Sequence, residues 1–395
     1  MINTLLNKIA NVLEKDFLFA SFLPALIFVA AVVGTFMGIV GFDAPWFWVA
    51  SWSTSQKAVA GAAVGVSLIV FAYILNGLRP SIGNLWSGSS GHFLLWLPCR
   101  IGTAIQRARF RRLHAKASRL GIWSQKRDKF LNQLQADWQG PTVPKIPEEQ
   151  KENLKRQIRE LTRTQRPDAV DAKLAAIAVF FKTYEGESVS SCYQSLKAKV
   201  DGWVNAEQFE LQGIAAELDK SFATLESVEA TTLGNVMESY NYYSYKRYRI
   251  ESEVFWPRLQ KVVSSEFKNT LADQKTLLDF ALTMATLAVV YVALAATVGP
   301  WLSYTPGLWV LLGAAGSMVA YVFYALAVSV AKQFGDLVRS AFDLFRLDLI
   351  KALGCPRPAD IEAERALWKQ LSILVVYGEG FNNFPIQPDS GGTHA

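Results

Sequence analysis

The chain has 395 residues, of which 51% are hydrophobic and 19% charged, and its formal net charge is +6. An average soluble chain carries about 25% charged residues, so this composition argues against the two or three soluble domains that the length would ordinarily suggest. The apolar residues are concentrated in a few long blocks, which indicates where the excess belongs.

Four apolar blocks occur along the chain: Phe17–Val40, Ala58–Gly77, Phe280–Val298 and Leu308–Ala331. None contains Asp, Glu, Lys, Arg or His, and each can cross about 30 Å of hydrocarbon, which takes roughly 20 helical residues. Any one block could instead be a buried helix of a soluble core, and the first could be a signal peptide. Together they predict a mainly α, polytopic membrane protein: four transmembrane helices in two hairpins, with a helical cytoplasmic region between them.

Aromatic residues fill the two short links between paired blocks, as expected of side chains that prefer the headgroup layer: Trp46, Trp48, Trp52, Trp301 and Tyr304. Between Arg79 and Phe130 there are 11 Lys or Arg and one acid, whereas the links carry almost no charge. Because basic loops tend to stay in the cytoplasm, both links are expected to face outward. The N-terminus, the middle and the C-terminus are then cytoplasmic, in a bacterial inner membrane.

The positive charge gathers in a basic juxtamembrane arm after the second block. Attraction to anionic lipid headgroups is the favoured interpretation, at about 1 kcal/mol per basic residue near the surface, and the headgroup candidates are Arg107, Arg109, Arg111 and Arg112. A protein partner is an alternative, and nucleic acid is the less favoured one.

The middle of the chain reads as a helical domain that follows a linker with three prolines, Pro141, Pro144 and Pro147. Helical patterns include Glu148–Thr164, Ala169–Tyr184 and Glu207–Thr224, the last with apolar Phe209, Ile214, Leu218 and Phe222. The expected organisation is a first hairpin at 1–80, the basic arm at 81–140, the helical domain at 141–276, a second hairpin at 277–331, and an amphipathic helix with a tail at 332–395.

Aromatic and basic residues interleave between Gly234 and Leu259, directly before the third span, and an amphipathic pattern at Arg339–Leu353 follows the fourth. A packed juxtamembrane layer, in which Pro257 ends an element, is favoured over a single-stranded nucleic-acid site. We expect these stretches to couple the cytoplasmic region to the spans through seven residues: Tyr245, Arg247, Tyr248, Trp256, Arg258, Asp343 and Arg346.

The same stretches carry a family resemblance. The pattern Gly234-Asn235, Glu238, Tyr245, Arg247-Tyr248, Ile250, Trp256-Pro257-Arg258-Leu259, then Phe342-Asp343, Arg346, Leu349, Glu364 and Trp368 resembles a group of uncharacterised bacterial four-span membrane proteins. The resemblance covers roughly Thr232–Lys369. It implies the topology and a bacterial inner membrane, and no activity.

Signatures of catalysis are missing from the sequence. It has no GxGxxG, GxxxxGK[ST], GxSxG or HExxH motif, and its three histidines are far apart. Paired acids such as Glu362 and Glu364 are expected to be solvated and structural. The sequence therefore predicts no enzyme, no cofactor and no metal. The alternative of a membrane-bound enzyme stays open, with polar groups at the cytosolic end of the spans that are expected to pair as structural ions: Glu238, Arg247, Arg258, Asp343 and Arg346.

Glycine spacing in three spans predicts close helix packing, within the monomer or between subunits, at Gly34, Gly38, Gly61, Gly65, Gly313 and Gly316. Charge-free spans argue against active transport. The favoured hypothesis is a homo-oligomeric channel or pore-like effector gated by its cytoplasmic helices. The alternative is a non-conducting membrane anchor or scaffold that recruits a cytosolic protein partner, within an antiviral defence system for instance.

Overall fold

The computed structural model describes residues 15–40, 49, 51–88, 96–137, 208–302 and 306–378. Throughout these residues the regular structure is helical and no strand occurs, so the mainly α class is confirmed. The chain divides into two compact units, Met1–Arg107 with Lys220–Ala395, and Ala108–Asp219. The helical patterns expected at Glu148–Thr164 and Ala169–Tyr184 and the aromatic residues Trp46, Trp48 and Tyr304 lie outside the described residues.

Four helical segments are long and apolar enough to cross a membrane: Lys15–Met37, Thr54–Ser87, Ser265–Gly299 and Gly307–Ala352. They correspond to α2 (Lys15–Phe17), the π-helix η1 (Leu18–Phe22) and α3 (Leu23–Val40), then α5 (Thr54–Ser87), α12 (Ser265–Leu302) and α13 (Pro306–Ala352). This is the architecture of a multi-pass membrane protein, and it confirms the four predicted spans.

The helices are longer than the apolar blocks that predicted them. α5 begins at a capping box, in which the Ser53 hydroxyl accepts from the Gln56 backbone N–H and the Gln56 side chain accepts from Ser53, and it continues past Pro80 to Ser87. The second link is shorter than the gap of residues 299–307 between the third and fourth apolar blocks, because α12 ends at Leu302 and α13 begins at Pro306.

α13 is a single helix of 47 residues, where the sequence suggested a span followed by a separate amphipathic helix. At 1.5 Å per residue it is about 70 Å long, more than twice the hydrocarbon thickness. No proline interrupts its second half. Glycine is needed at position 335 because a Cβ there would lie 2.8 Å from a ring carbon of Tyr240. The first half of α13 therefore forms the fourth span, and its second half continues beyond the apolar block as the same helix.

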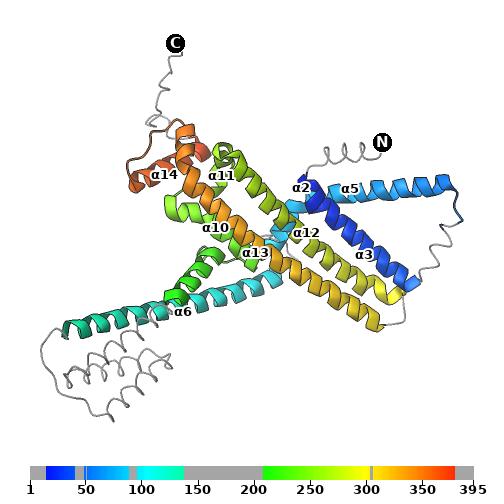
Figure 1. The fold of residues 1–395 in the computed structure, drawn as a ribbon, viewed down its shortest axis with the longest axis horizontal. Helices are drawn as coiled ribbons and strands as arrows, with labels where there is room; N and C mark the ends of the chain where they lie inside the picture. Colours follow the sequence, from blue (N-terminus) through cyan, green and yellow to red (C-terminus); the bar gives the residue numbers. More distant parts are fainter. Residues whose placement is uncertain are drawn as a thin grey trace, which may run out of the picture. The chain divides into compact units, whose positions relative to one another are not determined.

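Around the second half of α13 lie α10 (Thr232–Tyr248), α11 (Ser252–Val262) and α14 (Ile361–Tyr377), as Figure 1 shows. Their shared apolar centre, which we call the basal core, includes fully buried Phe255, Leu259, Phe342, Ile350 and Trp368. Burial of a large side chain of this kind stabilises the fold by about 1.5–3 kcal/mol. The basal core therefore fixes the second half of α13 in place.

The expectation that Pro257 ends an element is wrong, because Pro257 lies inside α11. Proline removes one helical hydrogen bond, yet α11 packs its apolar face so closely that Phe255 and Leu259 are completely buried. Residues 208–221 are helical as predicted, but Phe209 is 80% exposed rather than part of an apolar face.

Candidate functional site

The N-terminus of α10 docks on the end of α5 through the Gly234-Asn235 pair. The Thr231 hydroxyl caps α10 by accepting from the Gly234 N–H at 3.0 Å, and it donates to the Trp86 carbonyl at 2.7 Å. A Cβ at Gly234 would collide with the Ser87 carbonyl oxygen. The Asn235 side chain closes the preceding loop by bonding to the backbone of Glu229 and Thr231. These contacts orient the tyrosine-rich part of α10 along α13.

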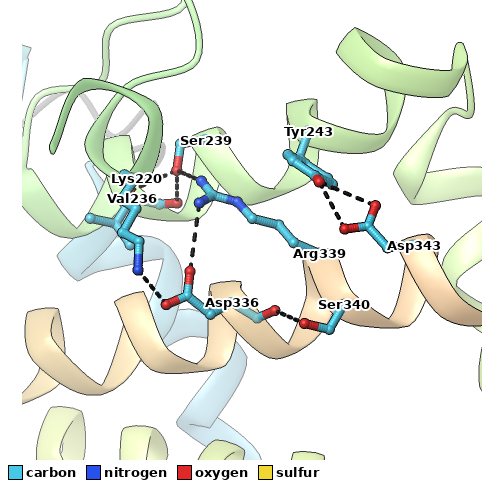
Figure 2. Close-up of polar contacts among 8 residues, drawn as sticks. All are labelled: Lys220, Val236, Ser239, Tyr243, Asp336, Arg339, Ser340 and Asp343. Carbon is cyan, nitrogen blue, oxygen red and sulfur yellow. Dashed lines mark hydrogen bonds and ion pairs between the residues drawn. The ribbon is translucent and has the colours of Figure 1, made fainter. Parts of the chain in front are cut away.

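Two tyrosines of α10 converge on one carboxylate of α13. The Tyr243 hydroxyl lies 2.9 and 3.1 Å from the two oxygens of Asp343, and the Tyr248 hydroxyl donates to Asp343 Oδ1 at 2.7 Å. Figure 2 shows Tyr243 facing Asp343 across the two helices. Hydrogen bonds to an ionised acceptor are roughly twice as strong as neutral ones. The pair of tyrosines thus holds α10 against α13.

Arg346 extends this arrangement to α14. Its Nε donates to Glu364 Oε1 at 2.8 Å, its guanidinium lies 4.2 Å from the Tyr248 ring centre, and it also bonds to the Asp343 carbonyl. The Trp368 indole N–H donates to the same Glu364 oxygen at 3.3 Å. We call Tyr243, Tyr248, Asp343, Arg346 and Glu364 the tyrosine–carboxylate cluster; it joins α10, α13 and α14.

Glu364 has the structural role expected of it, because it pairs with Arg346, but it is not solvated: its side chain is 6% exposed. Asp343 and Arg346, one turn apart in sequence, do not pair through their side chains within 4 Å; Arg346 pairs with Glu364 and the Asp343 carboxylate accepts from the tyrosines. Several of these contacts involve residues of the pattern on which the sequence resemblance rests, namely Gly234-Asn235, Phe342-Asp343 and Glu364. The spacing of these residues in the sequence did not predict which side chains they contact.

A second polar row lies one to two turns before Asp343 on the same helix (Figure 2). Asp336 pairs with Lys220 at 2.6 Å and with Arg339 at 3.7 Å. Arg339 donates to the Ser239 hydroxyl at 3.1 Å, and that hydroxyl lies 2.8 Å from the Lys220 carbonyl. Neither Arg339 nor Asp336 was predicted from the sequence as a coupling residue. This row adds a further connection between α10 and α13.

The other predicted coupling residues have different surroundings. The Arg247 guanidinium lies 5.3 Å from the Tyr243 ring centre, and Trp256 packs at 5.9 Å from the Phe342 ring. Tyr245 is partly exposed beside Arg249. Arg258 is exposed and donates to the Val254 carbonyl of its own helix, so the structure does not bring it to the cluster.

A polar cluster that the sequence analysis missed joins the first three spans. Arg79 of α5 donates from Nε and Nη2 to the buried Ser21 hydroxyl at 3.1 and 2.9 Å, and from Nη2 to the Asp16 carbonyl at 2.9 Å. Its Nη1 lies 3.9 Å from Asp279 of α12. Ser21 lies in η1, and π-helical turns occur frequently at functional sites. We call these residues the Arg79 cluster.

The glycines predicted for helix packing fall into two groups. A Cβ at Gly316 would lie 2.7 Å from Val292 Cγ2, so Gly316 lets α13 approach α12. Gly34, Gly61, Gly65 and Gly313 face open space as far as the described residues reach, since none of their atoms lies within 4 Å of the Cβ position. The side-chain surroundings of Gly38 lie outside the described residues.

In the basic arm, on α6 (Trp96–Asp137), Arg107, Arg111 and Arg112 are exposed. Arg109 pairs with Glu217 at 2.7 Å, and Lys116 pairs with Glu210 at 2.6 Å, both within the unit Ala108–Asp219. Part of the arm's charge is therefore matched by acids of residues 208–221.

Burial and hydrogen bonding raise the pKa of the clustered tyrosines. Desolvation and, after it, the hydrogen bond to Asp343 raise the pKa of Tyr248 to about 12, and the same causes raise the pKa of Tyr243. Near neutral pH the tyrosines remain protonated donors, which suits a structural connection between helices.

Outside this cluster, desolvation and the neighbouring Glu229 and Glu253 raise the pKa of Glu238, also on α10.

In the part of the chain that the structure describes, no three His, Cys, Asp or Glu side chains gather as metal ligands would. Comparison with family models, curated proteins and solved structures finds no match to the chain.

Proposed function

We propose that the protein is a homo-oligomeric channel of a bacterial inner membrane, gated by its cytoplasmic helices. The observation that carries the proposal is the continuity of α13, whose first half packs in the second hairpin and whose second half is held by the basal core. Because a helix of this length is stiff, a displacement of α10 or α14 moves the end of the fourth span. The basic flanks support an orientation with both termini in the cytoplasm.

Conduction requires more than one copy, because four packed helices enclose no aqueous path. Gly34, Gly61 and Gly65 support an oligomer, since no described residue covers them and small residues let helices of neighbouring subunits approach closely. A ring of apolar side chains could close such a pore by dewetting, without charged residues in the spans.

Liposomes that contain the purified full-length protein test the proposal by ion flux. The informative variant replaces Gly61 and Gly65 by Leu, which we expect to abolish both flux and the cross-linked oligomer. Gly77→Leu is a matched control, because Gly77 also has open space around it but lies about 120–160° away around α5. Absence of flux with the unmodified protein in any oligomeric state would refute the channel.

A non-conducting anchor or scaffold is the second candidate. It is favoured by the Arg79 cluster and the basal core, which fix spans to one another and to α10, α11 and α14 rather than leaving a loose hinge. Consistent recovery of one cytosolic protein in stoichiometric amount, without flux, would support this function. Loss of resistance to phage on deletion would place either function in antiviral defence.

A further inference from the structure

An open cleft of about 680 Å³ lies between α10, α11, α12 and α13. Its lining is largely apolar, and its apolar part, which we call the floor, includes Trp256, Leu271, Phe334 and Val338. Its volume falls in the range of small-molecule sites, roughly 300–1,000 Å³, which combine apolar walls with a few polar groups. The cleft is separate from the tyrosine–carboxylate cluster, whose five residues do not line it.

The charge around the cleft is positive. Lys261, Lys268 and Lys275 line it, against a single acid, Glu253. Within the described residues, none of the three lysines has a carboxylate within 4 Å. Lys275 has a longer-range charge interaction with Asp279, one turn further along α12. A ligand with phosphoryl groups would therefore find three ammonium groups that form no close ion pair with a described carboxylate.

The position of the cleft relative to the membrane distinguishes two sources of phosphoryl groups, a lipid headgroup and a soluble ligand. Lys275 precedes the apolar run that starts at Phe280 by about 7 Å along α12, and Lys268 by about 18 Å. On α13, Val338 lies about 10 Å beyond Ala331. The headgroup layer of one leaflet is only about 5–7 Å thick, so most of the cleft lies past the headgroups.

The apolar floor favours a ligand that has an apolar part. The apolar part of a bilayer lipid is its acyl chains, which stay in the hydrocarbon layer and do not reach a cleft beyond the headgroups. We propose that the cleft binds a soluble phosphorylated ligand with a flat ring, of the nucleotide class. The three lysines hold its phosphoryl groups, and the ring lies on the apolar floor beside Trp256. Such a ligand contacts α10, α11, α12 and α13 together. Its binding can be measured whether or not the protein conducts.

Equilibrium binding of ATP to the full-length protein in phosphatidylcholine nanodiscs tests this inference. We expect millimolar or tighter binding that weakens at high salt. Lys268→Gln combined with Lys275→Gln should weaken it about tenfold or more. Lys369→Gln is the matched control, because Lys369 is exposed on α14 and does not line the cleft. Tripolyphosphate should bind more weakly than ATP, since it lacks the ring.

Three results would overturn the inference. The first is no binding of ATP at millimolar concentration, and the second is binding that the double lysine variant leaves unchanged. The third is lysine-dependent retention of phosphatidylglycerol from mixed nanodiscs with no ATP binding, which would assign the cleft to a lipid headgroup. Similar unfolding temperatures of all variants without ligand would show that the lysine changes act on binding rather than folding.

Discussion

Removal of the Asp343 carboxylate should loosen α10 from α13. Two tyrosine hydroxyls donate to it, from Tyr243 at 2.9 Å and from Tyr248 at 2.7 Å. A hydrogen bond to a charged group contributes about 1.5–3 kcal/mol when buried, and partial exposure of the site reduces this. We therefore expect Asp343→Ala to lower the free energy of unfolding by about 2–3 kcal/mol, and Asp343→Asn by about 1 kcal/mol because one acceptor oxygen remains.

The assay is thermal unfolding of the purified protein in detergent, where about 2–3 kcal/mol corresponds to a drop of several degrees in the midpoint. Asp348→Ala is the matched control, since Asp348 is exposed on the same helix and the change in helix propensity is the same. A double-mutant cycle with Tyr248→Phe should give a coupling energy of about 1 kcal/mol or more, because the residues are in direct contact. Equal effects of the two alanine variants, or a coupling near zero, would refute the reasoning.

The same cluster predicts a dependence on alkaline pH. The pKa of Tyr248 is raised to about 12 in the folded protein, above its ordinary value near 10. Its stabilising contribution is therefore complete below about pH 10 and is lost as the pH rises toward 12. Between these values the stability of Tyr248→Phe should fall less steeply than that of the unmodified protein. Parallel curves would show that Tyr248 does not titrate in this way.

Substitutions at three further positions, Glu364, Gly316 and Arg79, each with a comparison variant, test the packing of helices around the spans and the basal core. Glu364→Gln should cost about 1–3 kcal/mol because it leaves a largely buried Arg346 without its carboxylate; exposed Glu362→Gln should change stability by less than about 0.5 kcal/mol. Gly316→Ala should destabilise the second hairpin by about 1 kcal/mol or more, since Val292 must move, whereas Gly313→Ala, with open space, should be neutral or stabilising. Arg79→Lys should lower the unfolding midpoint nearly as much as Arg79→Gln, because one ammonium cannot reproduce donation from two guanidinium nitrogens; a wild-type midpoint for Arg79→Lys would contradict this.

Local composition was sufficient to predict the four spans and the helical class. A block of about 20 uncharged apolar residues must satisfy its backbone within one helix in hydrocarbon, whatever its neighbours do. The same approach found the stretch around Tyr248 and the Asp343–Arg346 pair as places of interest, because aromatic and charged residues are concentrated there. It could not predict where those helices end, as α5 and α13 show by running well past their apolar blocks.

Only the tertiary structure decided which polar groups meet. Tyr243 and Asp343 are 100 residues apart, and Arg79 is 58 residues from Ser21. Glu364 looks like a surface acid in sequence and becomes buried because α14 packs with it facing Arg346 of α13, next to Trp368 of its own helix. Hydropathy depends on each residue alone, so the sequence by itself determined the four spans. A partnership between side chains depends on which helix faces pack together, and that was decided by the docking of α10 and α14 on the long helix α13.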